Sequence, residues 1–284
     1  MNMALEPRTE TSAPSTVYGP VESWRVGRSL GVDLLCNTSV CSFRCVYCQL
    51  GSINLHTGER KVYVKTERVL ADLAVSRWRE ADVITLSGSG EPTLAANLGE
   101  VIRAVKTLTG RPVLVLTNAT TLNDAQVRRD LCPADGVFCK LDAADERNFR
   151  IIARPVAGIT LGAVVEGIKR FRGEYAGRLA VQVMLLRQHR GRAEEFARLL
   201  GEIGPDEVQL NAPLRPVPRV WDRDARGNSQ SVSPRAVRVP TMSREEAAEF
   251  ESRLHELTGL KISSVYRRGE SRPPPGTTST SRGR

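Results

Sequence analysis

The chain has 284 residues, of which 40% are hydrophobic, so it is long enough for one large α/β domain with a buried core. Its six cysteines are too few and too clustered for a disulfide-stabilised scaffold. The polar N-terminal residues lack the apolar segment of an export signal, and no apolar run approaches the roughly 18 residues of a membrane span. We therefore expect a cytoplasmic protein that does not enter a membrane.

The net charge of +9 is concentrated in two segments rich in Pro, Ser, Gly and Arg. Residues 215–238 and residues 267–284 each carry four net positive charges, which leaves the rest of the chain near neutral. Arms of this kind either stay solvated and disordered or bind the phosphates of tRNA or another RNA. The sequence leaves both interpretations open.

Apolar runs and helical periodicity alternate along most of the chain, after a stretch at residues 18–31 that is typical of a loop. This alternation predicts a parallel sheet with right-handed crossovers and helices on its faces. Thr66 is expected to cap the first helix. Strands are expected at residues 30–35, 82–87, 112–117, 136–142, 179–186 and 207–211, and helices at residues 66–80, 98–108, 123–131, 161–175 and 192–203.

The strand–helix pattern fades after residue 213. The sequence Ser243-Arg-Glu-Glu246 is a capping box that should begin one more helix, which Gly259 should end before a final strand. We expect a disordered N-terminus at residues 1–16, a barrel domain at 17–213, a basic Pro/Arg-rich loop at 214–240, a C-terminal helix and strand at 241–267 and a disordered basic tail at 268–284.

Three cysteines, Cys41, Cys45 and Cys48, lie within eight residues. Three thiolates at this spacing can hold a metal centre, but they leave one position of a four-ligand site open. One interpretation is an iron–sulfur cluster with one iron available to another ligand. The other is a zinc site that Cys36 or His56 completes.

Ligands of parallel sheets bind at the carboxyl ends of the strands, and the polar residues of this chain gather there. The small residues of Gly88-Ser89-Gly90 would let a ligand approach the backbone, and Glu91 could accept a hydrogen bond from an ammonium group. Asn118 and Asp142 either bind a ligand or cap the next helix. Lys140 points either into the barrel or to its rim.

The other cysteines and histidines have no pattern that suggests chemistry. Cys132 and Cys139 are expected to be buried as small hydrophobic residues, and His189 and His255 are expected at the surface.

The CxxxCxxC run with Tyr47 before its last cysteine resembles the signature of the radical S-adenosylmethionine (SAM) superfamily. Over residues 18–215 the chain resembles the iron–sulfur oxidoreductase group related to the wyosine tRNA-modifying enzymes. The segments that carry this resemblance are Tyr18-Gly-Pro-Val, Gly27-Arg-Ser-Leu-Gly-Val-Asp33, Cys45-Val-Tyr-Cys-Gln-Leu-Gly51, Leu86-Ser-Gly-Ser-Gly-Glu-Pro-Thr-Leu94, Lys140-Leu-Asp-Ala143 and Val208-Gln-Leu-Asn211.

The resemblance implies a partial (β/α)6 barrel with a parallel sheet, plus a C-terminal helix–strand extension. It implies a [4Fe-4S] cluster on the three cysteines and SAM as the ligand of the open iron. Tyr47 would lie near the adenine, and Asn118 would bind the ribose or the carboxylate of the cofactor. Residues Gly88, Ser89, Gly90 and Glu91 would bind its methionine amino group.

The resemblance also implies an enzyme that cleaves SAM reductively, with an electron donor such as flavodoxin or ferredoxin. The resulting 5′-deoxyadenosyl radical would take hydrogen from a substrate, with Lys140 and Asp142 as candidate catalytic residues. Wyosine-type ring building is not expected, because only Cys36 precedes the cysteine run and no lysine precedes Lys61. Two kinds of substrate are left open. One is a tRNA, and the other is a protein or a small metabolite, with glycyl-radical activation as one version of the second. A metal-binding module without turnover is the non-enzymatic alternative.

Overall fold

The computed structural model describes residues 14–228 and 236–267. The sequence predicts disorder for residues 1–16 and for the basic tail. Most of the first segment, the whole tail and part of the basic loop lie outside the described residues, at residues 1–13, 268–284 and 229–235.

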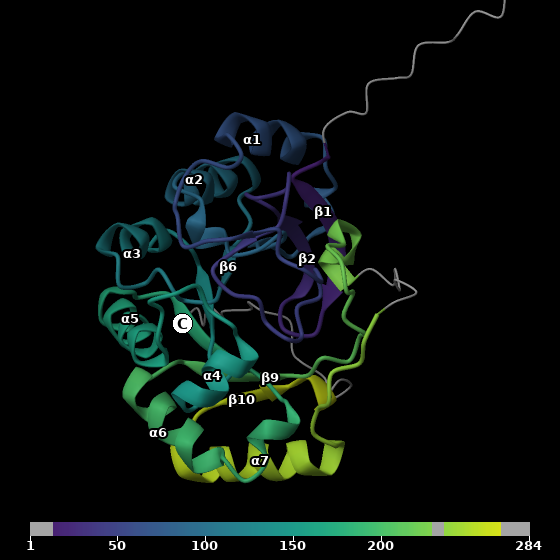
Figure 1. Ribbon diagram of the computed structural model, residues 1–284. Coiled ribbons are helices and arrows are strands. Elements are labelled where there is room, and N and C mark those ends of the chain that lie inside the picture. The colour runs from purple at the N-terminus through teal and green to yellow at the C-terminus, as the bar shows by residue number, and fades with distance from the viewer. Residues whose placement is uncertain (1–13, 229–235, 268–284) are drawn as a thin grey trace, which may run out of the picture.

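An eight-stranded sheet curls into a half-barrel, with its concave side open in Figure 1. The strand order is β1-β2-β5-β6-β7-β8-β9-β10; β1 runs antiparallel to β2, and the other neighbours are parallel. The predicted parallel α/β sheet is therefore confirmed. The strands are β1 Val17–Ser23, β2 Gly27–Val32, β5 Val83–Leu86, β6 Val113–Thr117, β7 Gly136–Lys140, β8 Arg178–Met184, β9 Glu207–Asn211 and β10 Ile262–Ser264, and a separate pair consists of β3 Val40–Cys41 and β4 Leu55–His56.

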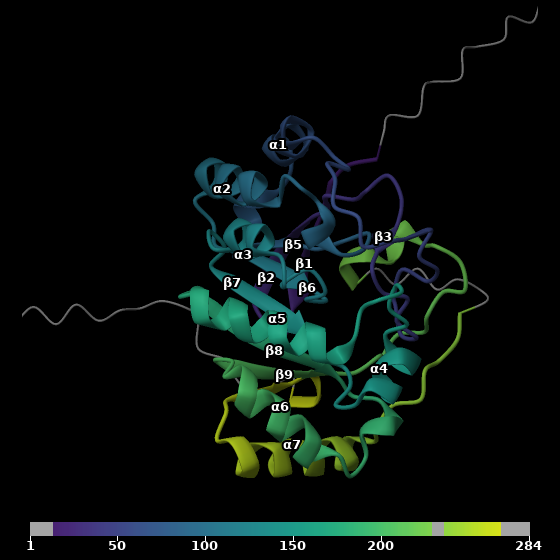
Figure 2. The ribbon, with the colours of Figure 1, turned by 60° about the vertical axis from the view of Figure 1, so that its left-hand side comes forward.

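Helices cover the convex face of the sheet, and α7 packs outside α6 (Figures 1 and 2). The apolar faces of the helices and the outer side chains of the strands form the main core, and α2 and α6, for example, each bury residues at helical spacing. The helices are α1 Thr66–Ala74, α2 Leu98–Thr109, α3 Ala125–Leu131, α4 Glu146–Ile152, α5 Leu161–Glu174, α6 Ala193–Ile203 and α7 Arg244–Thr258.

The loop predicted at residues 18–31 is wrong, because this stretch forms the hairpin of β1 and β2. In the sequence, Gly19 and Pro20 predict a turn. In the structure they lie at the sheet edge, where the pairing register shifts between Tyr18 and Val21. An edge strand with a bulge can accommodate a proline that a central strand could not.

Helix α4 was not predicted, and the cap predicted for α1 is wrong. Helix α4 buries only Phe149 and Ile152, which is too few for a periodic signal; the Asp145 side chain caps it by accepting from the Asn148 N–H at 2.9 Å. Thr66 lies inside α1, where its hydroxyl accepts from the Asn97 side-chain amide at 3.0 Å, and Lys65 occupies the cap position.

The C-terminal extension is confirmed. The Ser243 hydroxyl accepts from the Glu246 N–H at 3.2 Å, and the Glu246 carboxylate accepts from the Ser243 N–H at 2.8 Å. Gly259 ends α7 in the left-handed conformation, as expected for a helix stop. Strand β10 then pairs with β9, so the extension adds one parallel strand to the sheet edge.

The strap, which we define as residues 214–228, runs between the two edges of the half-barrel. It passes beside β1 and β2 in Figure 1, and its 3-10 helix Arg223–Asn228 packs on β1. The Arg226 guanidinium lies 2.7 Å from a carboxylate oxygen of buried Asp33 and 5.0 Å from the ring centre of Tyr18. This part of the predicted basic loop therefore turns a cation toward the sheet.

Two predictions about isolated residues are wrong. Cys132 is exposed, whereas Cys139 is buried as expected. His255 is exposed as expected, but His189 is only 1% exposed. The His189 ring lies edge-on to Phe196, and its Nε2 is 2.9 Å from the Asp142 carbonyl oxygen, so the neutral ring ties Asp142 in place.

Burial lowers the pKa of His189 below its ordinary value of 6.5, so the folded chain holds this ring neutral. The unfolded chain binds the proton more readily, and the free energy of unfolding should therefore fall as the pH drops below about 6.5. Urea unfolding from about pH 8 to about pH 5 measures this loss, and His189→Gln should reduce it. The control, exposed His255→Gln, should keep the wild-type profile. Equal profiles for all three proteins would contradict the assignment.

Candidate functional site

The cysteine loop, residues 41–48, begins at the end of β3, which lies at the carboxyl edge of the sheet (Figure 2). The glycine turn, residues 88–91, follows β5 at the same edge. The two are joined through Val40: its N–H donates to the Ser89 carbonyl at 2.8 Å, and its own carbonyl accepts from the Glu91 N–H at 2.9 Å. The structure thus brings together the two segments that the sequence had singled out separately.

The two glycines of the turn are required by contacts within the chain. A Cβ on Gly90 would lie 1.7 Å from the Val40 carbonyl oxygen, and φ is +147°. A Cβ on Gly88, where φ is +132°, would lie 2.4 Å from the Asp33 carboxyl carbon. Only glycine tolerates such positions. The sequence suggested that these glycines let a ligand approach the backbone. In the structure, the groups that approach them are the Val40 carbonyl and the Asp33 carboxylate.

Glu91 ties the ends of β5 and β6 together. Its carboxylate is 2% exposed and accepts from the Thr93 N–H and hydroxyl, from the Thr117 hydroxyl at 2.7 Å and from the Asn118 N–H at 2.6 Å. Burial raises its pKa, and these four donors oppose that effect. Its binding of a cofactor amino group stays a prediction, alongside the structural role that these contacts show.

Helix α4 holds the middle of the cysteine loop. The Arg44 N–H donates to the Ala153 carbonyl at 2.9 Å, and the Val46 N–H donates to the Ile152 carbonyl at 3.0 Å. The unpaired carbonyls at the end of a helix are natural acceptors for such a loop. An element that the sequence did not predict therefore fixes the backbone between the first and last cysteines.

The three thiols are half-buried, and two N–H groups lie near the first of them. The Cys41 sulfur lies 3.4 Å from the Phe43 nitrogen and 3.6 Å from the side-chain nitrogen of Asn118. Burial raises the pKa of all three thiols, that of Cys45 to about 12. N–H donors of this kind stabilise sulfur that carries negative charge, as it does when bound to iron.

The two candidates for a fourth ligand have partners of their own. Cys36 lies 3.8 Å from the Pro14 carbonyl oxygen and 3.7 Å from the Asn37 side-chain oxygen. The His56 Nε2 lies 3.2 Å from the Ser42 carbonyl oxygen. Among residues 14–228 and 236–267, no three His, Cys, Asp or Glu side chains are placed to hold a single metal ion.

Asp142, Lys140 and Tyr47 form one buried group. The Tyr47 hydroxyl donates to an Asp142 carboxylate oxygen, and the Lys140 ammonium lies 3.5 Å from the same oxygen and 5.0 Å from the Tyr47 ring centre. The other Asp142 oxygen accepts from the Met184 N–H at 2.7 Å. Burial, and next the charge of Asp142, raise the pKa of Tyr47 well above its ordinary value.

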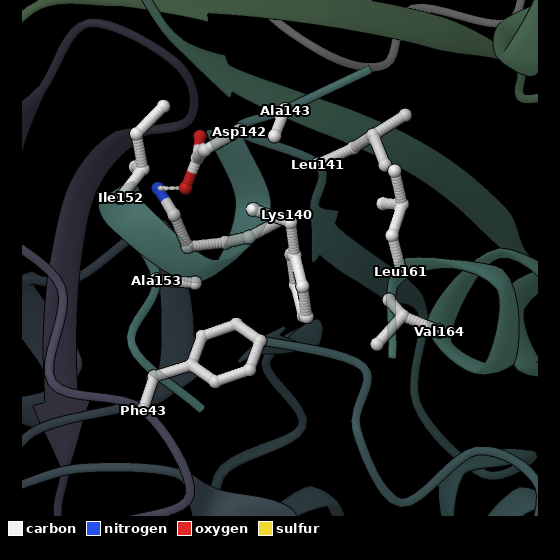
Figure 3. Close-up of a pocket in the computed structure, with 10 residues that line it drawn as sticks. Phe43, Lys140, Leu141, Asp142, Ala143, Ile152, Ala153, Leu161 and Val164 are labelled. Carbon is white, nitrogen blue, oxygen red and sulfur yellow. Dashed lines mark ion pairs between the residues drawn. The ribbon is translucent and has the colours of Figure 1, made fainter. Parts of the chain in front are cut away.

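Lys140 is the last residue of β7, and its side chain, which is 20% exposed, turns toward Asp142 and Tyr47. Figure 3 shows its ammonium paired with Asp142 at the wall of a mostly apolar pocket between the cysteine loop, α4 and α5. Phe43 of the cysteine loop lines this pocket as well. The helix-capping alternative for Asn118 and Asp142 is wrong, because Asp124 caps α3 and Asp145 caps α4.

Sequence reasoning missed the role of Asp33. This carboxylate is fully buried and accepts from the Ser89 N–H at 3.0 Å, from the Ser89 hydroxyl at 2.6 Å and from the Arg226 guanidinium at 2.7 Å. The available signal was its position directly after the apolar run that ends at Val32, which matches the position of Asp142 after its strand.

Comparison with known proteins identifies the family. The Radical SAM superfamily matches residues 37–200, which is more than half of the chain. The chain belongs to the radical SAM superfamily. It is 51% identical over 213 residues to the UPF0026 protein slr1464 of Synechocystis, with 75% of this chain and 80% of that protein covered, so it also belongs to the UPF0026 family.

Two further similarities agree with this assignment. The UPF0026 protein MJ1312 of Methanocaldococcus jannaschii is 32% identical over 206 residues, with 70% of this chain and 64% of that protein covered. The structure of TYW1 with a lysine–pyruvate adduct shares the fold, with a TM-score of 0.61, 16% identity, and coverage of 84% of this chain and 77% of that chain. The predicted relation to the wyosine enzymes is confirmed at the level of the fold.

Radical SAM membership makes this protein an enzyme with a [4Fe-4S] cluster and SAM as its cofactors, and such enzymes need a reductant. The residues present fit these groups: the cysteine loop offers three thiols with N–H donors at Cys41, and the glycine turn is fixed beside them. Among the residues that the structure describes, no helix is both long and apolar enough to cross a membrane.

Gly90→Ala should displace the cysteine loop, because the added methyl group would meet the Val40 carbonyl oxygen. We expect the iron content after anaerobic reconstitution to fall to well below half of the wild-type value, with the melting temperature lowered by several degrees. Gly173→Ala in α5 is the matched control, since nothing lies within 4 Å of its added Cβ. Wild-type iron content in Gly90→Ala would show that the docking of the loop does not govern cluster binding.

Proposed function

We propose that this enzyme cleaves SAM reductively at a [4Fe-4S] cluster on Cys41, Cys45 and Cys48 and so generates a 5′-deoxyadenosyl radical that takes hydrogen from a substrate in the half-barrel. The observation that carries the proposal is the pair of backbone hydrogen bonds through Val40. They put the segment with the thiols against the segment proposed for SAM, at the edge of the sheet where parallel α/β folds bind ligands.

The chain's own residues would position the cofactors and the substrate. Asn118 donates to the Cys41 sulfur and would keep that side of the loop in place. Tyr47, which directly precedes the last cysteine in the sequence, is anchored by Asp142, and its ring is proposed to lie near the adenine. Lys140 and Asp142 are paired at the wall of a mostly apolar pocket, where they would hold or exchange a proton in the role proposed for them as catalytic residues.

We further propose a one-electron donor such as flavodoxin or ferredoxin as partner. Exposed Arg44 lies within the cysteine loop and offers a cation beside the half-buried thiols. A complementary acidic surface on the donor would be guided to this edge by charge.

A tRNA or other RNA is the second candidate substrate. Two of the arginines that suggested it, Arg215 and Arg226, are turned toward the half-barrel, where Arg226 is paired with Asp33. A small metabolite or a protein side chain that enters the half-barrel fits this arrangement better. RNA recognition would instead appear as tRNA binding that weakens steeply as the salt concentration rises.

Cys45→Ala should abolish SAM cleavage, because it removes one of the three proposed cluster ligands. The assay is anaerobic: the reconstituted protein is mixed with dithionite and SAM, and 5′-deoxyadenosine is quantified by mass spectrometry. Cys132→Ala is the matched control, since this thiol is exposed and lies outside the cysteine loop. It should form as much product as the wild type.

Two outcomes would exclude the proposal. One is the absence of 5′-deoxyadenosine from wild-type protein that contains a complete cluster. The other is undiminished product from Cys45→Ala. The first would leave a metal-binding module without turnover as the better account.

A further inference from the structure

The strap is a part of the molecule to which the superfamily assignment gives no role. The Radical SAM match ends at residue 200, whereas the strap begins at residue 214. The 3-10 helix of the strap, Arg223–Asn228, nevertheless packs on β1 at the edge of the half-barrel (Figure 1). The role of the strap therefore has to be inferred from its own contacts.

The strap first contacts the chain directly after the last cysteine. The Asp222 N–H donates to the Leu50 carbonyl at 2.9 Å. Gly51 makes room for the strap, because a Cβ at this position would lie 2.1 Å from the Val220 carbonyl oxygen, and φ is +75°. The segment that follows Cys48 is therefore held against the strap by contacts of the main chain.

The strap next contacts the buried carboxylate that holds the glycine turn. The Arg226 guanidinium, with a side chain 9% exposed, donates to an oxygen of Asp33 at 2.7 Å. The same oxygen accepts from the Ser89 N–H at 3.0 Å and from the Ser89 hydroxyl at 2.6 Å. One oxygen atom thus receives two hydrogen bonds from the glycine turn and one from the strap.

The guanidinium of Arg226 also reaches the turn through an aromatic ring. It lies 5.0 Å from the ring centre of Tyr18, whose hydroxyl oxygen is 2.7 Å from that of Ser87. Burial raises the pKa of Tyr18 to about 12, so the phenol stays protonated and this pair keeps its hydrogen bond. Ser87 directly precedes Gly88. The strap is therefore connected to both the start and the middle of the turn.

These contacts make the turn dependent on the strap. A buried carboxylate is costly unless a cation and hydrogen-bond donors compensate it. The strap supplies the cation for Asp33, and the turn supplies two of its donors. Without the guanidinium, Asp33 would draw in water or turn toward another donor, and Ser89 would lose its fixed acceptor.

We propose that Arg226 is a positioning residue for SAM, which acts through Asp33 to hold the glycine turn in the orientation that receives the cofactor. The inference rests on the proposed function, which places SAM on this turn. Because the strap also fixes the segment after Cys48, it holds both sides of the site together. Coupling between two sites is reciprocal, so bound SAM must in turn stabilise the strap.

The first test measures SAM binding to the reconstituted protein by anaerobic equilibrium dialysis without a reductant. Arg226→Gln should raise the Kd for SAM about tenfold, which is a typical size for such coupling. Its iron content should equal that of the wild type, and its rate of 5′-deoxyadenosine formation at saturating SAM should be close to the wild-type rate. Arg226→Lys should recover part of the affinity, because it keeps the charge but not the planar guanidinium.

Two controls separate this role from a general effect on the strap. Arg219→Gln removes an exposed arginine of the same strap and should bind SAM as the wild type does. Asp33→Asn should weaken binding by itself, and Arg226→Gln should add little in that background, because Arg226 acts through Asp33. Melting curves without SAM show whether each variant is folded.

The second test uses the wild-type protein, so it does not depend on the folding of a variant. Saturating SAM should slow amide hydrogen exchange in peptides from residues 214–228 as well as in those that contain the glycine turn. Peptides from α7, which packs outside α6, should exchange at the same rate with and without SAM.

The inference is overturned if SAM leaves exchange in the strap unchanged, or if folded Arg226→Gln binds SAM as the wild type does. It is also overturned if Arg219→Gln has the same effect, if Arg226→Gln loses iron in step with affinity, or if its full effect persists with Asp33→Asn. SAM binding that depends on Arg226 without any 5′-deoxyadenosine would instead refute the proposed function alone. A wild-type protein with a complete cluster that binds no SAM would refute both.

Discussion

The contact between Val40 and the glycine turn is the constraint on which the site depends. Two backbone hydrogen bonds fix it, and Gly90 allows it because no side chain fits between the turn and the Val40 carbonyl. Each such bond contributes only about 1 kcal/mol to stability. The importance of this contact is geometric, since Val40 directly precedes Cys41 and only Ser87 separates the turn from the end of β5.

One buried carboxylate connects this contact to the rest of the half-barrel. Asp33 accepts from Ser89 of the glycine turn and from Arg226 of the strap, and the Arg226 guanidinium lies over the ring of Tyr18 in β1. A buried ion pair with these added hydrogen bonds is costly to break from either side. The position of the strap beside β1 and the position of the turn beside the cysteines are therefore coupled.

Much of the fold and part of the site could be predicted from the sequence, because they depend on local patterns. The spacing of Cys41, Cys45 and Cys48 and the alternation of apolar strands with helices are local in this sense. Helix α4 and strand β1 were missed because α4 is two turns long and β1 contains Gly19 and Pro20 at an edge. Their stability comes from tertiary contacts that override local preference.

The inward positions of His189 and Arg226 could not be predicted for a related reason. Each is a polar residue whose position depends on a partner far away in the sequence: Asp142 for His189, and Asp33, which is 193 positions away, for Arg226. Without the partner, the surface is the better expectation for both. The basic character of residues 215–238 suggested an arm, whereas the described part of it closes over the sheet.

The central claim is that the cysteine loop and the glycine turn together form one site for the cluster and for SAM. Electron paramagnetic resonance of the reduced, reconstituted protein tests it most directly, because the spectrum of a cluster changes when a ligand binds its open iron. The account predicts a [4Fe-4S] signal that shifts when SAM is added. A cluster signal that is identical with and without saturating SAM would contradict it.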